Sequence, residues 1–197
     1  MLLHDLDLSG NCYKVRLFAA LTGTSLDLVP VDFAAGQHHD PAFRKLNPFE
    51  EVPVLVDGDF ILRDSQAILV YLAGRLPDRS WWPDDSRSQA SIMQWLSVAA
   101  SEVRGGPNVA RLIRKFGYAL DMDAALRQTG RLLPLLDAHV ATRDWFALDR
   151  PTIADCALFP YLALAPEGGI DLSPYPALAR WFGRVRSLAG FIPMPGL

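Results

Sequence analysis

The first 77 residues switch between strand-like and helix-like spacing of apolar positions. A short apolar start at residues 1–8 passes through small polar residues into helical spacing over residues 15–21. Residues 26–33 alternate apolar and charged positions, which predicts a second strand with Pro30 at an edge or a bulge. A helix between two strands is typical of a right-handed βαβ unit.

A hairpin and another helix complete this first pattern. Two apolar runs flank Asp57-Gly58, and this dipeptide is a strong signal for a tight β-hairpin. Helical spacing then covers residues 66–76, with Asp64 or Ser65 as the N-cap. The predicted order is therefore βαβ, a loop, and ββα.

Strand patterns disappear in the second half, where the spacing is helical throughout. Residues 78–88 are polar and punctuated by proline, and we interpret them as a linker. Trp81 and Trp82 within this linker either pack into one or both domains or form a partner-binding patch. The sequence thus predicts an α/β plus all-α chain, with one domain at residues 1–77 and an all-helical domain at residues 89–197.

Composition and charge exclude several classes of protein. Hydrophobic residues make up 50% of the chain and charged residues 21%, which is a globular composition. Residues 1–77 hold 6 Lys+Arg against 10 Asp+Glu, a net charge of −4, which leaves +1 for residues 78–197. Neither part has the basic excess of a nucleic-acid binder. No apolar run approaches the roughly 18 residues that span a membrane, so we expect no membrane partner.

Cysteine and histidine usage points to the cytoplasm and away from metal binding. Cys12 and Cys156 make no disulfide framework, and no apolar leader opens the sequence, so we expect a cytoplasmic protein. The 4 scattered histidines and the two distant cysteines give no metal-ligand spacing, so we expect no metal site. Cys156 falls within an apolar helix and is expected to be a core residue.

The turn at residues 9–16 is the first candidate site. A turn that feeds a helix N-terminus leaves backbone N–H groups unpaired and carries a partial positive charge, which suits an anion such as a thiolate. Ser9 would lie at the mouth of this turn with a hydroxyl free to donate. The alternative is that Ser9 or Asn11 only caps the helix. The helix predicted after Ser65 offers a second N-terminus of the same kind.

Four segments, in this order along the chain, resemble the cytosolic glutathione transferases of the bacterial type, with a serine in the active-site turn. The segments are Ser9-Gly10-Asn11-Cys12 with Lys14-Val15-Arg16, Asn47-Pro48 with Val52-Pro53, Asp64-Ser65-Gln66-Ala67-Ile68 with Tyr71-Leu72, and Thr152-Ile153-Ala154-Asp155. The resemblance covers essentially the whole chain. It implies a thioredoxin-like βαβ-ββα domain followed by an all-helical domain, glutathione as co-substrate, a homodimer and a role in detoxification.

The resemblance assigns the sulfur chemistry to the turn. Ser9 would donate a hydrogen bond to the glutathione sulfur, and the helix dipole would add to this effect, so that the thiol pKa falls from about 8.5 toward neutrality. Asn11 and Cys12 are further candidates in the same turn. Cys12 stands in C-x-x-C spacing with Ser9 in place of the first cysteine, so a glutathione-dependent thiol-disulfide or peroxide reductase is an alternative function.

The remaining contacts to glutathione are also implied by the resemblance. Val52, held by a cis-Pro53, would offer its backbone N–H and C=O to the cysteinyl residue. Ser65 would bind the γ-glutamyl carboxylate at a helix N-terminus, with Asp64 near the γ-glutamyl amino group. His38 falls about where family members contact the glycyl end.

Two glutamates depart from the family pattern. Glu50 and Glu51 stand where the family often has glycine followed by lysine or glutamine before Val-Pro. Glu51 is kept as a candidate glutathione-binding residue, but its charge does not attract the glycyl carboxylate. Either glutathione binds more weakly, or an arginine or lysine from elsewhere replaces the contact. The two glutamates also leave open a non-catalytic binding or regulatory protein that uses the same fold.

The electrophile site is expected in a cleft between the domains, with the all-α domain forming its apolar side. Arg104, Asn108 and Arg111 are spaced 4 and 3 apart and either line one face of this cleft or form a solvated or dimer-facing stripe. The leading hypothesis is a transferase in which bound glutathione, as a thiolate, attacks a small hydrophobic electrophile. No motif identifies that electrophile.

Overall fold

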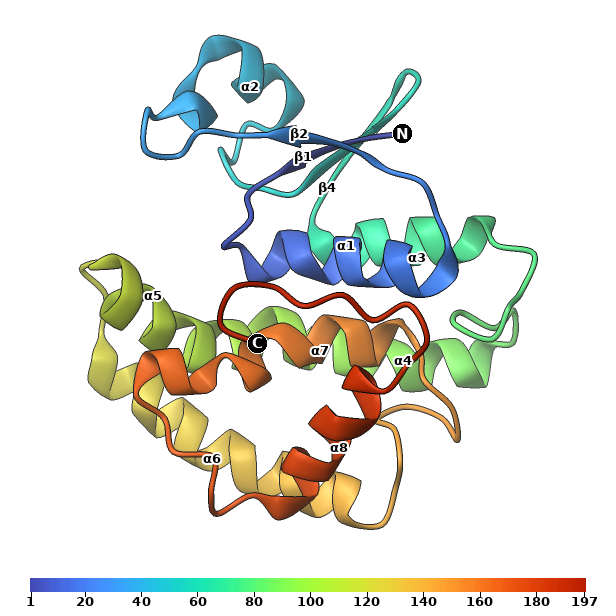
Figure 1. Cartoon of the computed structure of the whole chain (residues 1–197), viewed down its shortest axis with the longest axis vertical. Helices are drawn as coiled ribbons and strands as arrows, with labels where there is room; N and C mark the ends of the chain where they lie inside the picture. Colours follow the sequence, from blue (N-terminus) through green and yellow to red (C-terminus); the bar gives the residue numbers. More distant parts are fainter.

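The computed structural model describes residues 1–197, and its first domain is a four-stranded mixed sheet with helices on both sides (Figure 1). The strands lie in the order β2-β1-β3-β4, with β1 and β2 parallel and the other neighbours antiparallel. Their bounds are β1 (Leu2–Asp5), β2 (Asp27–Pro30), β3 (Val54–Asp57) and β4 (Phe60–Arg63). The predicted βαβ and ββα units are confirmed, and Gly58, at φ 64°, forms the hairpin turn with Asp59.

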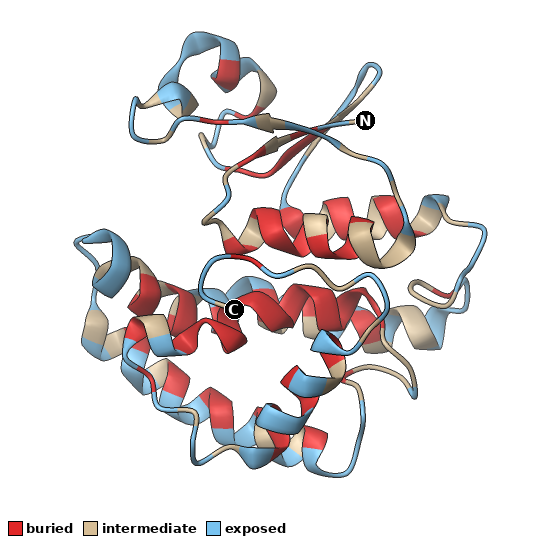
Figure 2. Ribbon diagram, in the orientation of Figure 1, coloured by how far each residue is buried: buried red, intermediate tan, exposed pale blue.

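Two long helices cover the face of the sheet that is turned toward the second domain (Figure 1). The helices of this domain are α1 (Gly10–Thr22), α2 (Pro41–Leu46) and α3 (Ser65–Arg75), with a short 3₁₀ turn, η1 (Gln37–His39), before α2. Helix α1 begins where Ser9 leaves extended geometry and caps it, and it ends at Gly23, which adopts the left-handed conformation at φ 67°. Because α1 lies between the sheet and the helical domain, most of its surface is buried (Figure 2).

The second domain is entirely helical, as predicted. Its elements are α4 (Ser86–Val98), η2 (Ala99–Asn108), α5 (Val109–Phe116), α6 (Met122–Ala141), α7 (Ile153–Ala163), η3 (Ala165–Gly168) and α8 (Pro176–Arg186). Every residue of α7 is buried, because α1 and α3 of the first domain pack against it, as do α4, η2 and α8 of its own domain (Figure 2). One hydrophobic core therefore runs through both domains. None of these helices combines the length and the apolar character needed to cross a membrane.

The Gly105-Gly106-Pro107 stretch, expected to interrupt or kink a helix, lies in the π-helical segment η2, which joins α4 to α5 without a break. A wider helical turn accommodates Pro107, which has no N–H to donate. Gly106 packs closely on α6, since a Cβ atom there would lie 2.8 Å from Oγ1 of Thr129. The segment therefore holds α6 against the long helical run from α4 to α5.

The connection between the domains contacts both of them. Trp81 packs edge to face on Phe18 of α1, with ring centroids 5.4 Å apart, and both Trp81 and Trp82 contact the main core. The Arg150 Nε donates to the carbonyl of Ser80 at 3.1 Å. These contacts favour packing into the domains over the alternative of a partner-binding patch. Helix α4 begins inside the segment predicted as linker, at Ser86.

The capping motif at the start of α7 is confirmed. Thr152 accepts from the Ala154 N–H, and the Asp155 carboxylate accepts from the Thr152 N–H at 3.0 Å. The same carboxylate accepts from the Phe146 N–H at 3.2 Å and from Trp181 Nε1 at 3.0 Å. Asp155 thus joins the preceding loop, α7 and α8 at one buried point.

Candidate functional site

The turn between β1 and α1 brings Ser9 to the N-terminus of a buried helix. The Cys12 N–H donates to Ser9 Oγ at 3.3 Å, so Ser9 is the N-cap of α1. A serine hydroxyl that accepts one hydrogen bond keeps its own proton to donate. Capping and donation to a ligand are therefore compatible roles for this side chain, and they need not be alternatives.

Tyr161 of α7 packs directly under this turn. A Cβ atom on Gly10 would lie 2.6 Å from Cε1 of Tyr161, so only glycine fits between the turn and the ring. The Asn11 N–H donates to the Tyr161 hydroxyl at 3.1 Å. Burial raises the pKa of Tyr161 to about 12, so the hydroxyl keeps its proton. No sequence signal marked Tyr161, because it looks like one more apolar position in a buried helix.

Cys12 lies on the far side of the turn, away from solvent. Its side chain is fully buried in a small cluster with Val31, Phe43 and Val54. Burial, together with the charge of Asp5, raises the pKa of the Cys12 thiol to about 12. A thiol in this state is a poor nucleophile, which argues against the redox alternative.

The loop before β3 supplies a backbone edge without a hydrogen-bond partner at Val52, a residue that is 8% exposed. The peptide bond between Val52 and Pro53 is cis, as expected from the sequence. Asn47 holds the loop, because its Nδ2 donates to the carbonyl of Glu51 at 2.8 Å. The N–H and C=O of Val52 form no backbone hydrogen bond within the chain, so both are available to an added strand.

Asp64 and Ser65 open helix α3 beside the turn. Asp64 has a positive φ of 76° and caps the helix, accepting from the Gln66 and Ala67 N–H groups at 3.0 Å. Ser65 Oγ donates to Gln66 Oε1 at 2.7 Å and lies 3.4 Å from Asn11 Oδ1. The amide of Asn11 therefore connects the N-terminus of α1 with that of α3.

These segments meet in one small cleft with a volume of about 30 Å³. It is lined by Asn11, Asn47, Glu51, Val52, Pro53, Arg63, Asp64 and Ser65. Two helix N-termini and a free backbone edge point to a ligand with an anionic group and a peptide backbone. Arg63, on β4, was missed by sequence reasoning because no local motif distinguishes it from an ordinary strand residue.

His38, Glu50 and Glu51 are held by partners outside this lining. The His38 ring stacks on Phe33 with centroids 3.9 Å apart. Glu50 contacts His39 and pairs with Arg44, whose Nε lies 2.6 Å from its carboxylate. Glu51 lies 3.3 Å from Nη2 of Arg104. The charges of Glu50 and Glu51 are thus each compensated by a cation.

The arginines expected on one face of the electrophile site occupy two different environments. Arg104 is exposed at the edge of the cleft, where it reaches Glu51. Arg111 is only 2% exposed; its Nε donates to Glu167 at 2.5 Å and its Nη1 to the carbonyl of Leu8 at 3.1 Å. Asn108 is buried, and its Oδ1 has no hydrogen-bond partner. Arg111 therefore holds the backbone at Leu8, directly before the turn that contains Ser9.

Known protein families and relatives match both parts of the chain. The family model described as glutathione S-transferase, N-terminal domain, matches residues 3–74, and the model for the C-terminal domain matches residues 90–189. Glutathione S-transferase 2 of Anopheles gambiae is 33% identical over 88% of this chain and 84% of its own length. Glutathione S-transferase theta-1 of Bos taurus is 41% identical over 93% of this chain and 81% of its own length.

A solved structure shares the whole arrangement. The crystal structure described as a possible glutathione S-transferase from Rhodopseudomonas palustris superposes with a TM-score of 0.89 at 32% identity. The match covers 98% of this chain and 89% of that one. Sheet, connection and helical domain are therefore arranged alike in the two proteins.

Proposed function

Since this chain belongs to the glutathione S-transferase family, we propose that it activates bound glutathione as a thiolate for attack on a small hydrophobic electrophile. The observation that carries the proposal is the single cleft in which Val52, Asp64 and Ser65 meet beside the turn of Ser9. This set of groups matches the chemistry of a γ-glutamyl tripeptide.

In the proposed binding mode, the tripeptide is held mainly by backbone and by helix N-termini. The N–H and C=O of Val52 pair with the cysteinyl residue as an added strand would. The γ-glutamyl carboxylate lies at the N-terminus of α3 against Ser65, with its amino group toward Asp64. The glycyl end lies toward Glu51 and Arg104, where the arginine compensates the acidic side chain.

The proposed chemistry begins with ionisation of the thiol. The Ser9 hydroxyl donates to the sulfur, and the dipole of α1 favours its negative charge, so the thiol loses its proton to solvent near neutral pH. The thiolate then forms a sulfur–carbon bond with the electrophile. Either a leaving group departs with the electron pair of the broken bond, or an activated double bond accepts the electron pair and then a proton.

Two alternatives are less well supported. A thiol-disulfide or peroxide reductase would need a reactive protein thiol, and both Cys12 and Cys156 are buried, with burial raising each thiol pKa. A purely regulatory protein would not need Ser9, the Val52 backbone edge and Ser65 arranged around one cleft. A detoxifying role in the cytoplasm fits the transferase proposal.

The binding mode is tested by isothermal titration with glutathione. We expect Ser65→Ala to weaken binding by about tenfold or more, because a hydrogen bond to a charged group contributes roughly 1.5–3 kcal/mol. Ser97→Ala is the matched control, because Ser97 is exposed on α4 and bonds only to the carbonyl of Met93. Wild-type protein that does not bind glutathione, or equal affinities of the wild type and the Ser65 variant, would contradict the proposal.

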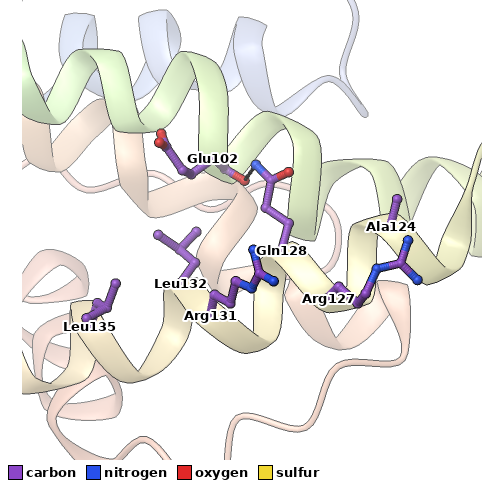
Figure 3. A pocket seen from close by; sticks show the side chains of 7 residues that line it. All are labelled: Glu102, Ala124, Arg127, Gln128, Arg131, Leu132 and Leu135. Atoms are coloured by element: carbon purple, nitrogen blue, oxygen red, sulfur yellow. Dashed lines mark hydrogen bonds between the residues drawn. The ribbon is translucent and has the colours of Figure 1, made fainter.

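We also propose that the protein is a two-fold homodimer in which the first domain of one subunit meets the helices of the other. Phe49, beside the cleft loop, is 60% exposed, and Leu135 of α6 is 69% exposed. A groove of about 420 Å³ lies between η2 and α6 (Figure 3). Arg127 and Arg131 line it, and their charge complements the acidic first domain.

Phe49→Arg is expected to convert the dimer to monomers, because a charge would replace an aromatic anchor at the interface. Sedimentation or light scattering would then report a mass near 21.8 kDa in place of twice that value. Leu28→Arg is the control, since Leu28 is an exposed apolar residue on β2, an edge strand of the sheet. A monomeric wild type, or a dimeric Phe49 variant, would refute this interface.

A further inference from the structure

Lys14 is a buried cation without a carboxylate partner. Its side chain is 1% exposed, and it takes part in no salt bridge. Its Nζ donates to Asn11 Oδ1 at 2.9 Å and lies 5.3 Å from the centre of the Tyr161 ring. A buried ammonium held by one amide and one ring face is only partly compensated, so it is poised to respond to a nearby anion.

The position of Lys14 connects it to the anion site. Asn11 Oδ1, which accepts from Lys14, also lies 3.4 Å from Ser65 Oγ. Asn11 and Ser65 both line the cleft, whereas Lys14 lies behind them. Asn11 and Ser65 thus lie between Lys14 and a carboxylate that binds Ser65.

Two charged groups near Lys14 act on it in opposite directions. Asp64, at the start of α3, favours the ammonium, and Arg104 of η2 disfavours it. Tyr161 of α7 and Cys12 of α1 are neutral, because their pKa values are raised to about 12. Burial is then the largest influence, and it lowers the pKa of Lys14 to about 7. The free protein therefore holds Lys14 in both protonation states near neutral pH.

We propose that Lys14 is a positioning residue of the glutathione site, which takes up a proton from solvent when the γ-glutamyl carboxylate binds and, as an ammonium, holds Asn11 and Ser65 toward that carboxylate. The inference rests on the proposed function. Its physical basis is linkage, because an anion placed near an amine favours the protonated form. By the same linkage, the ligand binds more tightly when Lys14 is already charged.

The direction of the pH effect follows directly. Ligand binding raises the proton affinity of Lys14. The extra affinity for the ligand that this charge provides is therefore fully present below the pKa of Lys14 in the free protein, which is about 7. This extra affinity is lost as pH rises through the higher pKa that Lys14 has in the complex. We expect the affinity for S-methylglutathione, which has no titrating thiol, to fall about tenfold between roughly pH 6 and pH 8.5.

The chain allows a direct measurement, because its only lysines are Lys14, Lys45 and Lys115. Protein labelled with ¹³C at the lysine ε-carbons would be titrated by NMR, free and saturated with S-methylglutathione. The Lys14 signal, identified by its loss in Lys14→Met, should titrate near neutral pH in the free protein and at least about one pH unit higher in the complex. Lys45, exposed on α2, is the internal reference and should not change.

Two variants separate charge from packing. Lys14→Arg keeps a charge that does not titrate, so its affinity for S-methylglutathione should be close to that of the wild type at pH 6 and should not fall as pH rises. Lys14→Met should bind about tenfold more weakly than the wild type at pH 6 and show the same flat profile, while Lys45→Met, the matched control, behaves as the wild type. If arginine at this position restores the affinity that methionine loses, the charge of Lys14 and not its volume is what positions the site.

Three results would overturn the inference. Lys14 could titrate at the same pH with and without bound ligand, or it could titrate near the ordinary lysine value in the free protein. Lys14→Met could keep the affinity and pH profile of the wild type. In each of these cases the ligand still binds, so glutathione recognition stands. A wild type that gives no binding heat and no shifted signal overturns both this inference and the proposed function.

Discussion

Alanine in place of Ser9 is expected to lower kcat/KM for conjugation of an activated aryl halide by about 10²-fold. The variant removes the donor that faces the sulfur, and loss of one donor to a developing or fixed negative charge commonly costs 10²–10³ in rate. The pKa of the bound thiol should rise back toward about 8.5. Ultraviolet absorbance of the bound thiolate, followed against pH, measures this change separately from the rate.

The controls for Ser9 must account for its second role as a helix cap. Loss of the cap alone costs about 1 kcal/mol of stability. Asp121→Ala removes the equivalent cap from α6, where Asp121 accepts from the Ala124 N–H, and it should leave the thiol pKa unchanged. Ser9→Thr keeps the hydroxyl and should retain most of the activity. A Ser9→Ala enzyme with the wild-type rate and thiol pKa would show that Ser9 is a cap and nothing more.

Asp155→Ala is expected to destabilise the protein by about 3–5 kcal/mol, the largest effect on stability that we predict. The carboxylate accepts from Thr152, Phe146 and Trp181 at a point that is 1% exposed, and its removal leaves these buried donors unpaired. Urea unfolding of the wild type and the variant measures the difference. Asp171→Ala, an exposed carboxylate with local partners only, should unfold almost as the wild type does.

The effect of Asp155 also depends on pH in a defined direction. Burial raises the pKa of Asp155 to about 6, above the unfolded value of about 3.9. The folded protein therefore holds a proton that the unfolded chain has lost, and this contribution to stability is lost as pH rises from about 4 through 6. The stability difference between the wild type and Asp155→Ala should be larger at pH 4.5 than at pH 7.5 by roughly 2 kcal/mol. A difference that stays constant over this range would contradict the assignment.

The sequence by itself determined most of the elements, although α4 begins at Ser86, inside the segment predicted as linker. Alternating spacing marked the strand at β2, short apolar runs marked the other strands, and helical spacing marked α1, α3 and the second domain, because these patterns follow from local backbone geometry. Caps such as Ser9, Asp64 and Thr152 act within a few residues of their own position, so local sequence narrowed each cap to one or two candidate residues. The hairpin turn at Gly58 was likewise predicted from adjacent residues alone.

Only the tertiary structure showed how the tryptophans in the connection between the domains pack. Its tryptophans are apolar in a polar segment, and sequence alone left two outcomes open for them. Trp81 packs on Phe18 because α1 presents a buried ring there, and residues 63 positions apart cannot be related by local spacing.

The interior of the site was decided only by packing across elements. Lys14 would be read as a solvated residue on a helix, but α1 is enclosed by the sheet and by α7, so even this position is buried. Tyr161 reaches the turn because Gly10 has no side chain, and Asn11 meets Ser65 because two helices begin side by side. Such contacts depend on how helices and sheet are placed relative to one another, and no local period encodes that placement.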